Sequence, residues 1–189
     1  MSRILLARHG ETAWNAAGRL QGHTDIALAD SGRAQARALA QRLAGAGVTA
    51  VWTSDLARAR ETGEIVAASL GVAILVEPEV RERRFGVFEG LTREQCATEH
   101  PEAWRAWLVQ SSPPPGGETK ESVVARMTRA LGRILDGATG TSLVVSHGAV
   151  MRLWMMHVVG ATVPLIPNGA TFAVERAGAA GFAVRAHPA

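Results

Sequence analysis

Two histidines in this sequence each follow a short apolar run, in surroundings that suit chemistry on phosphate. Arg8-His9-Gly10 follows Ile4–Ala7, and Ser146-His147-Gly148 follows Leu143–Val145. A neutral imidazole can attack phosphorus, and a guanidinium can bind phosphate oxygens in a bidentate manner. Because the pattern occurs twice, far apart in the chain, we predict that the fold brings both histidines together in an enzyme that acts on phosphate.

The strands that must position these side chains are predicted from four short apolar runs, which we expect to be buried and parallel. The runs are Ile4–Ala7, Ala50–Thr53, Val72–Val76 and Leu143–Ser146. Phe172–Val174 and Phe182–Val184 instead predict an antiparallel hairpin at the edge of the sheet. Such a hairpin leaves an unpaired strand edge, through which a homodimer can form.

Helical spacing separates the runs and predicts four helices. They are a helix capped by Ser31 that ends near Ala44, one capped by Asp55 that ends at Leu70, and the segments Glu118–Leu135 and Ala149–Val159. The alternation predicts a single α/β domain over residues 1–189, built as a three-layer α/β/α sandwich around a mainly parallel sheet with an antiparallel edge.

Residues 91–117 break this alternation and predict a helical insertion, or lid, closed by a Pro-rich loop. Trp104 and Trp107 lie in this insertion. We interpret both as packing residues of the insertion, with an apolar wall over the substrate as the alternative.

Several charged side chains follow the predicted strands at the point where each strand ends. In open α/β sheets, ligands bind outside the carboxyl ends of the strands. Arg8 and His9 follow the first strand, Arg58 lies after the second, Glu82 follows the third, and His147 follows the fourth. The rule therefore predicts that two histidines, two arginines and a carboxylate meet at one rim.

This set of groups suits phosphoryl transfer through a phosphohistidine. An imidazole with an ordinary pKa near 6.5 is mostly neutral at pH 7, and nearby arginines favour the neutral form further. The leaving alkoxide needs a proton, which a carboxylic acid held close to phosphate can supply. Arginines and the second histidine bring positive charge, so the reaction needs no metal and no cofactor.

Composition excludes several other classes of protein. The net charge is only +3, and basic residues are interspersed with acidic ones, so we expect no binding to nucleic acid. No apolar run is long enough to span a membrane or to serve as a signal peptide, and the single cysteine fits a reducing compartment, so we expect a cytoplasmic protein. The other four histidines lack metal-ligand spacing.

The sequence resembles the histidine phosphatase superfamily, in its phosphoglycerate mutase-like branch, over nearly its whole length. The segments that carry the resemblance are Arg8-His9-Gly10-Glu11-Thr12 with Asn15, Leu20-Gln21-Gly22, Ser54-Asp55-Leu56-Ala57-Arg58-Ala59, Arg81-Glu82 with Phe85-Gly86, and Val145-Ser146-His147-Gly148. The fold of that family agrees with the α/β sandwich predicted above.

The resemblance implies a role for each of these site residues. His9 would be the phosphorylated nucleophile, Glu82 the proton donor, and Arg8, Arg58 and His147 the walls of the phosphate pocket. The residues that would contact phosphate or substrate are Asn15, Gln21, Gly22 and Gly148, with Arg60 as a further candidate. Arg83 and Arg84 depart from the family pattern, and their charge would favour the ionised form of Glu82 unless the side chains point away.

Three activities fit this resemblance. We favour hydrolysis of a small phosphomonoester, because the insertion offers only Arg93 and Arg105 to retain the doubly phosphorylated intermediate that a mutase needs. A phosphoglycerate mutase-type isomerase is the first alternative. A phosphoester-binding relative without catalysis is the second, although binding alone does not require an attacking histidine and a proton donor. The identity of the phosphomonoester cannot be derived from the sequence.

Overall fold

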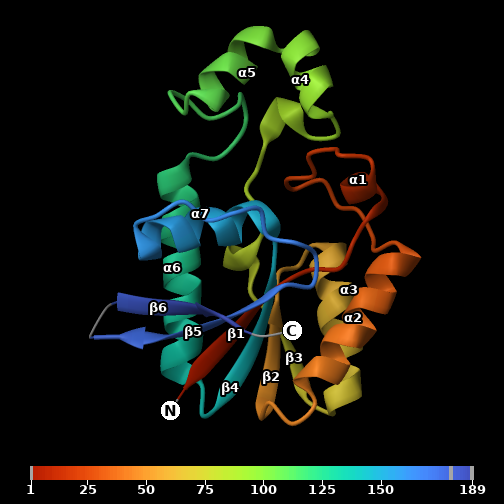
Figure 1. Cartoon of the computed structure of the whole chain (residues 1–189), viewed down its shortest axis with the longest axis vertical. Coiled ribbons are helices and arrows are strands. Elements are labelled where there is room, and N and C mark those ends of the chain that lie inside the picture. Colours follow the sequence, from red (N-terminus) through yellow and green to blue (C-terminus); the bar gives the residue numbers. More distant parts are fainter. Residues whose placement is uncertain (1, 179–180, 188–189) are drawn as a thin grey trace.

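One six-stranded sheet runs through the computed structural model, which describes residues 2–178 and 181–187. The strands are β1 (Arg3–Arg8), β2 (Val48–Thr53), β3 (Ala73–Val76), β4 (Thr141–Ser146), β5 (Thr171–Ala177) and β6 (Gly181–Ala186), in the spatial order β3-β2-β4-β1-β5-β6 (Figure 1). The first four strands pair in parallel, whereas β5 and β6 add antiparallel pairs at one edge. The predicted mainly parallel sheet with an antiparallel edge is confirmed.

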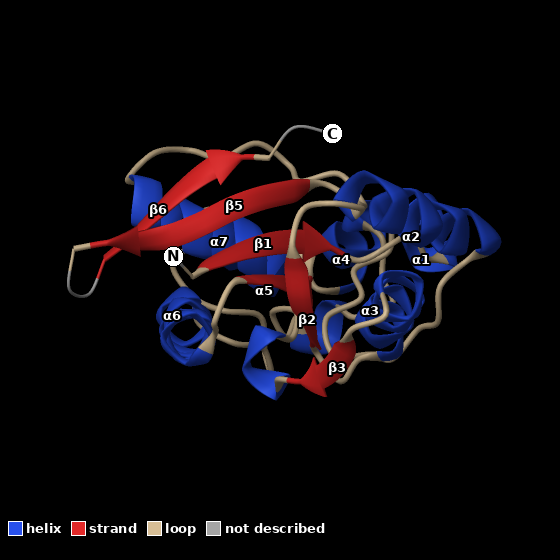
Figure 2. Ribbon diagram, turned by 90° about the horizontal axis from the view of Figure 1, so that it is seen from below, coloured by secondary structure: helices blue, strands red, loops and turns tan. Residues whose placement is uncertain are grey.

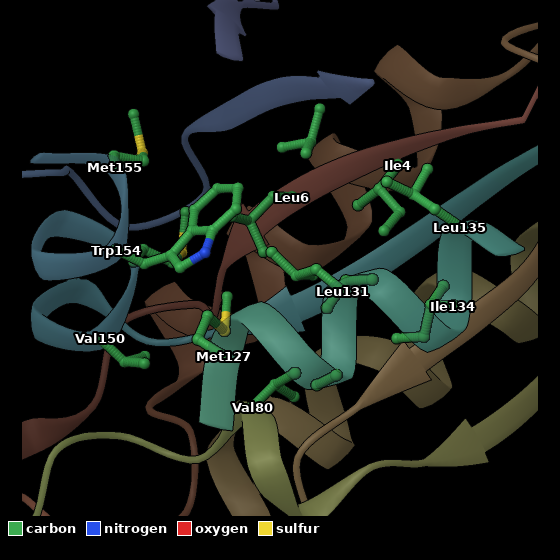
Figure 3. Packing of buried hydrophobic residues seen from close by; sticks show 14 of the residues in the cluster. Ile4, Leu6, Val80, Met127, Leu131, Ile134, Leu135, Val150, Trp154 and Met155 are labelled. Carbon is green, nitrogen blue, oxygen red and sulfur yellow. The ribbon is translucent and has the colours of Figure 1, made fainter. Parts of the chain in front are cut away.

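Two pairs of helices cover the two faces of the sheet. They are α2 (Asp30–Leu43) with α3 (Ala57–Leu70), and α6 (Lys120–Gly137) with α7 (Gly148–Val159). Successive side chains of a strand point to opposite faces, so Leu5 and Ala7 pack under α2 and α3, while Ile4 and Leu6 pack under α6 and α7. Figure 2 shows the strands between the helix pairs, and Figure 3 shows the α6–α7 side of the core. The predicted three-layer sandwich is therefore confirmed.

The starts of two helices differ from the prediction. Helix α2 begins one residue before Ser31, whose hydroxyl donates instead to the Glu11 carboxylate at 2.6 Å. Helix α3 begins at Ala57, whose backbone N–H is capped by the Asp25 carboxylate at 2.7 Å, while Asp55 pairs with an arginine. The predicted caps were wrong because side chains from distant segments bind Ser31 and Asp55. At α3, Asp25 also takes the place of the predicted cap.

The third predicted strand exists, but it is not buried. Strand β3 lies at the edge of the sheet and pairs only with β2. Its side chains Ile74, Leu75 and Val76 keep 38%, 39% and 51% of their surface exposed. An apolar run predicts a strand, whereas burial depends on neighbours that the run does not specify.

The predicted insertion forms two short helices, α4 (Arg93–Glu99) and α5 (Pro101–Leu108), followed by a Pro-rich loop. Both lie beyond the carboxyl edge of the sheet, on the same side as the short helix α1 (Ala13–Ala16) (Figure 1). Thr92 caps α4 through a capping box with Gln95. No helix in the described part of the chain is long and apolar enough to cross a membrane.

Candidate active site

The parallel register of β1 and β4 brings the two histidines together. Arg8 lies opposite Ser146, and the backbone N–H of His9 donates to the Ser146 carbonyl at 3.0 Å. The imidazole centroids of His9 and His147 are consequently 5.0 Å apart, with the rings tilted by 59°. Both side chains are buried. The structure therefore places at one rim the two residues that the sequence separates.

The surroundings of His9 determine which nitrogen can react. Its Nδ1 lies 2.6 Å from the Gly10 carbonyl, which can only accept, so Nδ1 carries the proton and donates. Nε2 therefore holds a free lone pair. Burial, followed by the positive charges of Arg58 and Arg8, keeps the pKa of His9 well below its ordinary value. A neutral imidazole with a free Nε2 is the form that can attack phosphorus.

His147 lies behind His9, and both of its ring nitrogens have partners inside the protein. Arg58 Nε donates to His147 Nδ1 at 3.2 Å, so the proton of the neutral ring is on Nε2, which donates to Ser54 Oγ at 2.7 Å. Burial, followed by the charge of Arg58, lowers the pKa of His147 well below its ordinary value. His147 does not belong to the wall of the cavity described below. In this arrangement it orients Arg58 and packs against His9.

Arg58 is completely buried and held by the backbone of a neighbouring loop. Its Nη1 donates to the Thr24 carbonyl at 2.9 Å, and its Nη2 donates to the Gly22 carbonyl at 2.7 Å. Gly22 has φ of +54°, and a Cβ atom there would lie 2.2 Å from the Glu89 carboxylate. Gly22 is also outside the wall of the cavity. Gly22 therefore positions Arg58 through its carbonyl group, and its contact with substrate stays a prediction.

Two buried polar atoms in the wall of the cavity have no hydrogen-bond partner in the part of the chain that the structure describes. They are Arg8 Nε and Gln21 Oε1. Arg8 is anchored by its Nη1, which donates to the Ile166 carbonyl at 2.6 Å, so its Nε remains free to donate. The absence of a side chain at Gly148 leaves room for this guanidinium, since a Cβ atom there would lie only 3.1 Å from Arg8 Nε. Buried polar groups are almost always paired, so two unpaired atoms in one cavity indicate a polar ligand.

Glu82 is held at the start of α7 by backbone N–H groups. Its Oε1 accepts from the N–H of Arg83 and of Val150, both at 2.8 Å, and its Oε2 accepts from Ala149 at 3.1 Å. The Arg83 guanidinium turns to the Glu118 carbonyl, to which Nε donates at 3.0 Å, and Arg84 is exposed. Neither arginine pairs with the Glu82 carboxylate among the described ion pairs.

The groups converge on a cavity of about 390 Å³ under the lid. Its wall contains His9, Asn15, Gln21, Glu82, Gly148 and the six arginines Arg8, Arg19, Arg58, Arg83, Arg93 and Arg152. Seven arginines form ion pairs with carboxylates in the described part of the chain, and none of these seven lines the cavity. Six arginines and a single carboxylate residue line the cavity, so it suits an anionic ligand.

Arg60 is the predicted site residue that the structure places elsewhere. It lies two residues beyond Arg58, on the exposed face of α3, and its Nε donates to the Glu64 carboxylate at 3.0 Å. The helix turns the two side chains about 200° apart, so only Arg58 reaches the rim. The expectation that Arg60 contacts substrate is therefore corrected.

The sequence left open whether the two tryptophans of the lid pack the insertion or form a wall over the substrate, and they differ in this respect. Trp104 is buried against Phe88, with ring centroids 5.4 Å apart, and does not line the cavity. Trp107 stacks against Trp104 at 4.9 Å and also forms part of the cavity wall.

Several residues that support the site were missed by the sequence analysis. Asn168 Nδ2 donates to the His9 carbonyl at 2.9 Å, and Thr62 Oγ1 accepts from the Gly10 N–H at 3.1 Å. Thr62 lies one helical turn after Arg58, a spacing that could have indicated it. Asn168 lies in an irregular segment before β5, where no pattern points to a role.

Comparisons with known proteins agree with this geometry. Residues 4–175 match the histidine phosphatase superfamily (branch 1). "Phosphoglycerate mutase-like protein 4" of Arabidopsis thaliana is 40% identical over 157 residues, which are 80% of this chain and 68% of that protein.

Solved structures extend the likeness to the whole fold. The structure of Bacillus stearothermophilus YhfR superposes with a TM-score of 0.89 at 30% identity, covering 98% of this chain and 96% of that one. A putative alpha-ribazole-5'-P phosphatase from Escherichia coli gives a TM-score of 0.85 at 28% identity, with 98% and 95% covered. The paired histidines, the buried arginines and these matches together show that the chain belongs to branch 1 of the histidine phosphatase superfamily.

Proposed function

We propose that this protein hydrolyses a small phosphomonoester through a phosphohistidine formed on His9. One observation carries the proposal: the unprotonated Nε2 of a buried, neutral His9 shares a cavity with Arg8, Arg58 and Glu82. An attacking nitrogen, two guanidinium groups and a carboxyl group are the parts that phosphoryl transfer requires.

In the first step, the lone pair of His9 Nε2 forms a bond to phosphorus while the bond from phosphorus to the leaving oxygen breaks. The protonated Glu82 gives its proton to that oxygen, so the alcohol leaves neutral. Arg8 and Arg58 stabilise the negative charge on the phosphoryl oxygens, so the step needs no metal ion. His147 contributes by orienting Arg58 and by packing against the reacting ring.

In the second step, water resolves the phosphohistidine. The Glu82 carboxylate takes a proton from the water molecule as its oxygen attacks phosphorus, and the N–P bond breaks with its electron pair returning to His9 Nε2. Inorganic phosphate leaves, and Glu82 is protonated again, ready for the next ester. The likeness to the putative alpha-ribazole-5'-P phosphatase of Escherichia coli supports this assignment.

A mutase-type isomerase is the second candidate. The lid sequence offers few arginines for such a reaction, but arginines from other segments also line the cavity. Arg19, Arg83 and Arg152 reach the cavity from outside residues 91–117 and join Arg93 there. Arg105 does not line the cavity, and its Nε donates to the Pro101 carbonyl at 3.2 Å. Four lining arginines beyond Arg8 and Arg58 suit a substrate with a second anionic group. The Arabidopsis relative carries a phosphoglycerate mutase-like name.

Product analysis distinguishes the candidates. The protein is incubated with p-nitrophenyl phosphate, with a panel of alkyl phosphates, and with 3-phosphoglycerate with and without bisphosphoglycerate, all in the presence of EDTA. We expect release of inorganic phosphate, an acid-labile phosphoenzyme, and the loss of both in His9→Ala. Isomerisation of 3-phosphoglycerate without release of phosphate would establish the mutase instead. Binding of phosphoesters without turnover would indicate a relative that does not catalyse.

A further inference from the structure

Arg126 on α6 is buried outside the cavity, and its guanidinium donates hydrogen bonds to backbone carbonyl groups of the segment that carries Glu82. Nη1 donates to the carbonyls of Glu79 and Arg81, both at 2.7 Å, and Nη2 donates to the Glu82 carbonyl at 2.9 Å. Only 9% of the residue is exposed, and it does not line the cavity. One guanidinium therefore holds three carbonyl groups within four residues.

Glu118 completes this arrangement from the end of the Pro-rich loop. Its carboxylate accepts from Arg126 Nε at 2.9 Å and from the Arg84 N–H at 2.8 Å. Its backbone carbonyl accepts from Arg83 Nε at 3.0 Å and from Arg83 Nη2 at 2.9 Å. Burial acts to raise the pKa of Glu118, yet the pKa is lowered overall because Arg126 and the Arg84 N–H bind the charged form. The ion pair thus clamps residues on both sides of Glu82.

The segment needs such a clamp because Arg81–Phe85 belongs to no helix or strand. Arg8 and Arg58 belong to β1 and α3, and His9 follows β1 directly, where its N–H donates to the Ser146 carbonyl. Glu82 instead lies in a loop, and its carboxyl group must meet the leaving oxygen to within a few tenths of an ångström. Three N–H groups fix the carboxyl end of the side chain. Arg126, together with His23 at 2.8 Å, binds the Glu82 carbonyl, while Asp55 pairs with the Arg81 side chain and Glu118 binds Arg83 and Arg84.

We propose that Arg126, with Glu118, is a positioning residue that places the proton donor Glu82 for transfer to the leaving group. The inference rests on the proposed function, because it assigns Arg126 to the protonation step of that reaction. Arg126 touches neither the substrate nor the phosphoryl group, so it acts on the reaction only through the Glu82 segment.

The leaving group of the substrate separates this role from a general structural one. An alkyl phosphate needs a proton on its leaving oxygen, whereas p-nitrophenolate leaves as a stable anion. The value of kcat/KM reports steps up to release of the alcohol, so the later hydrolysis of the phosphohistidine does not affect it. A displaced Glu82 must therefore lower kcat/KM for glycerol 2-phosphate much more than for p-nitrophenyl phosphate.

The experiment compares Arg126→Met with the wild type on both substrates. We expect kcat/KM for glycerol 2-phosphate to fall about 10²-fold and that for p-nitrophenyl phosphate to fall less than about tenfold, since general acid catalysis contributes about 10²–10⁴-fold. Arg126→Lys and Glu118→Gln keep more of the packing and should show the same selective loss at smaller size. They also replace Arg126→Met if that variant does not fold.

Arg129→Met is the matched control. Arg129 lies one turn further along α6, is exposed, and donates to the Glu79 carboxylate at 2.6 Å, so it offers an ion pair to the same loop without holding its carbonyl groups. We expect it to leave both kcat/KM values within about twofold of the wild type, as is usual for exposed ion pairs.

A double variant closes the test. If Arg126 acts through Glu82, adding Arg126→Met to Glu82→Gln should lower kcat/KM for glycerol 2-phosphate no further. Equal losses on the two substrates in the single variant, or multiplying losses in the double variant, would overturn the positioning role. Turnover that survives in His9→Ala would instead overturn the proposed function, so the two failures are distinguishable.

Discussion

The rim of the sheet and the lid build opposite walls of one cavity in different ways. The rim collects His9, Arg58 and Glu82 from distant parts of the chain, with His147 behind them, and each is held by hydrogen bonds to backbone or buried groups. The lid is one continuous segment. It packs Cys96 and Trp104 against Phe85 and Phe88, while Val109 keeps 75% of its surface exposed.

This difference separates two functions within one cavity. The rim is fixed before any ligand arrives, because strand register and buried hydrogen bonds set each position, and such preorganised charge is what stabilises a transition state. The two lid residues in the cavity wall, Arg93 and Trp107, come from a segment that contributes none of the hydrogen bonds holding His9 and Arg58, so they can be exchanged without moving those groups. Chemistry should therefore depend on the rim, and choice of substrate should depend on the lid.

The largest test of this division removes a cation from the rim. Arg58→Met should lower kcat/KM about 10²–10³-fold for every phosphomonoester alike, the cost typical of losing one preorganised donor in an active site. Arg60→Met, two residues along the same helix, should change nothing beyond about twofold, because Arg60 pairs with Glu64 at the surface. Unequal losses across a substrate panel in Arg58→Met would mean that the rim also selects the substrate.

The second prediction concerns Gly86, where the loop after Glu82 meets the lid. Gly86 has φ of +55°, and a Cβ atom there would lie 2.1 Å from the Pro115 carbonyl oxygen. Gly86→Ala should therefore lower the free energy of unfolding by about 2–5 kcal/mol, the sum of left-handed backbone strain and a backbone clash. Gly160→Ala, with φ of +68° and open space around it, should show only the strain of about 1–2 kcal/mol. Urea unfolding measures both, and equal losses would show that rim and lid do not meet firmly here.

A smaller effect is expected from the lid itself. Trp107→Leu removes part of the cavity wall, so it should change the ratio of kcat/KM values across a panel of phosphomonoesters by about tenfold, as expected from a lost apolar contact of 1–3 kcal/mol. Trp104 lies next to Trp107 but is buried against Phe88. Trp104→Leu should therefore lower thermal stability and leave the ratios of kcat/KM values unchanged. The same loss on all substrates in Trp107→Leu would assign the lid to chemistry.

The rim was predictable from the sequence for a physical reason. Short apolar runs reveal buried strands, and parallel strands end at the same edge, so His9, His147, Arg8, Arg58 and Glu82 could be placed together without coordinates. The orientation of a side chain within the site was not predictable. Which nitrogen of His147 carries a proton depends on partners from separate segments, and those partners direct the ring toward Arg58 and Ser54.

The edge position of β3 and the role of Arg126 could not be predicted, because both depend on contacts between segments that are distant in the sequence. The run Val72–Val76 predicts a strand, but its place at the edge depends on the order of all six strands. Arg126 has the spacing of any residue on an amphipathic helix, and only the packing of α6 against the turn that includes Pro78–Val80 gives it three carbonyl groups to bind. The lid was predictable as an interruption of a regular alternation, yet nothing in its sequence separates the role of Trp104 from that of Trp107.

The smallest expected effect is on the pH dependence of stability. Burial, together with Arg58 and Arg8, holds the pKa of His9 well below its ordinary value of 6.5, and His147 is shifted in the same direction. Between 6.5 and those lowered values, the unfolded chain binds protons that the folded protein does not, so the free energy of unfolding must decrease as the pH falls below about 6.5. His9→Gln removes one of these groups and should make the decrease shallower. Trp107→Leu, a change in the lid, should leave its slope unaltered. Chemical denaturation between pH 5 and pH 8 measures how the free energy of unfolding changes with pH in the wild type and both variants. Equal slopes for wild type and His9→Gln would show that His9 does not destabilise the folded protein in acid.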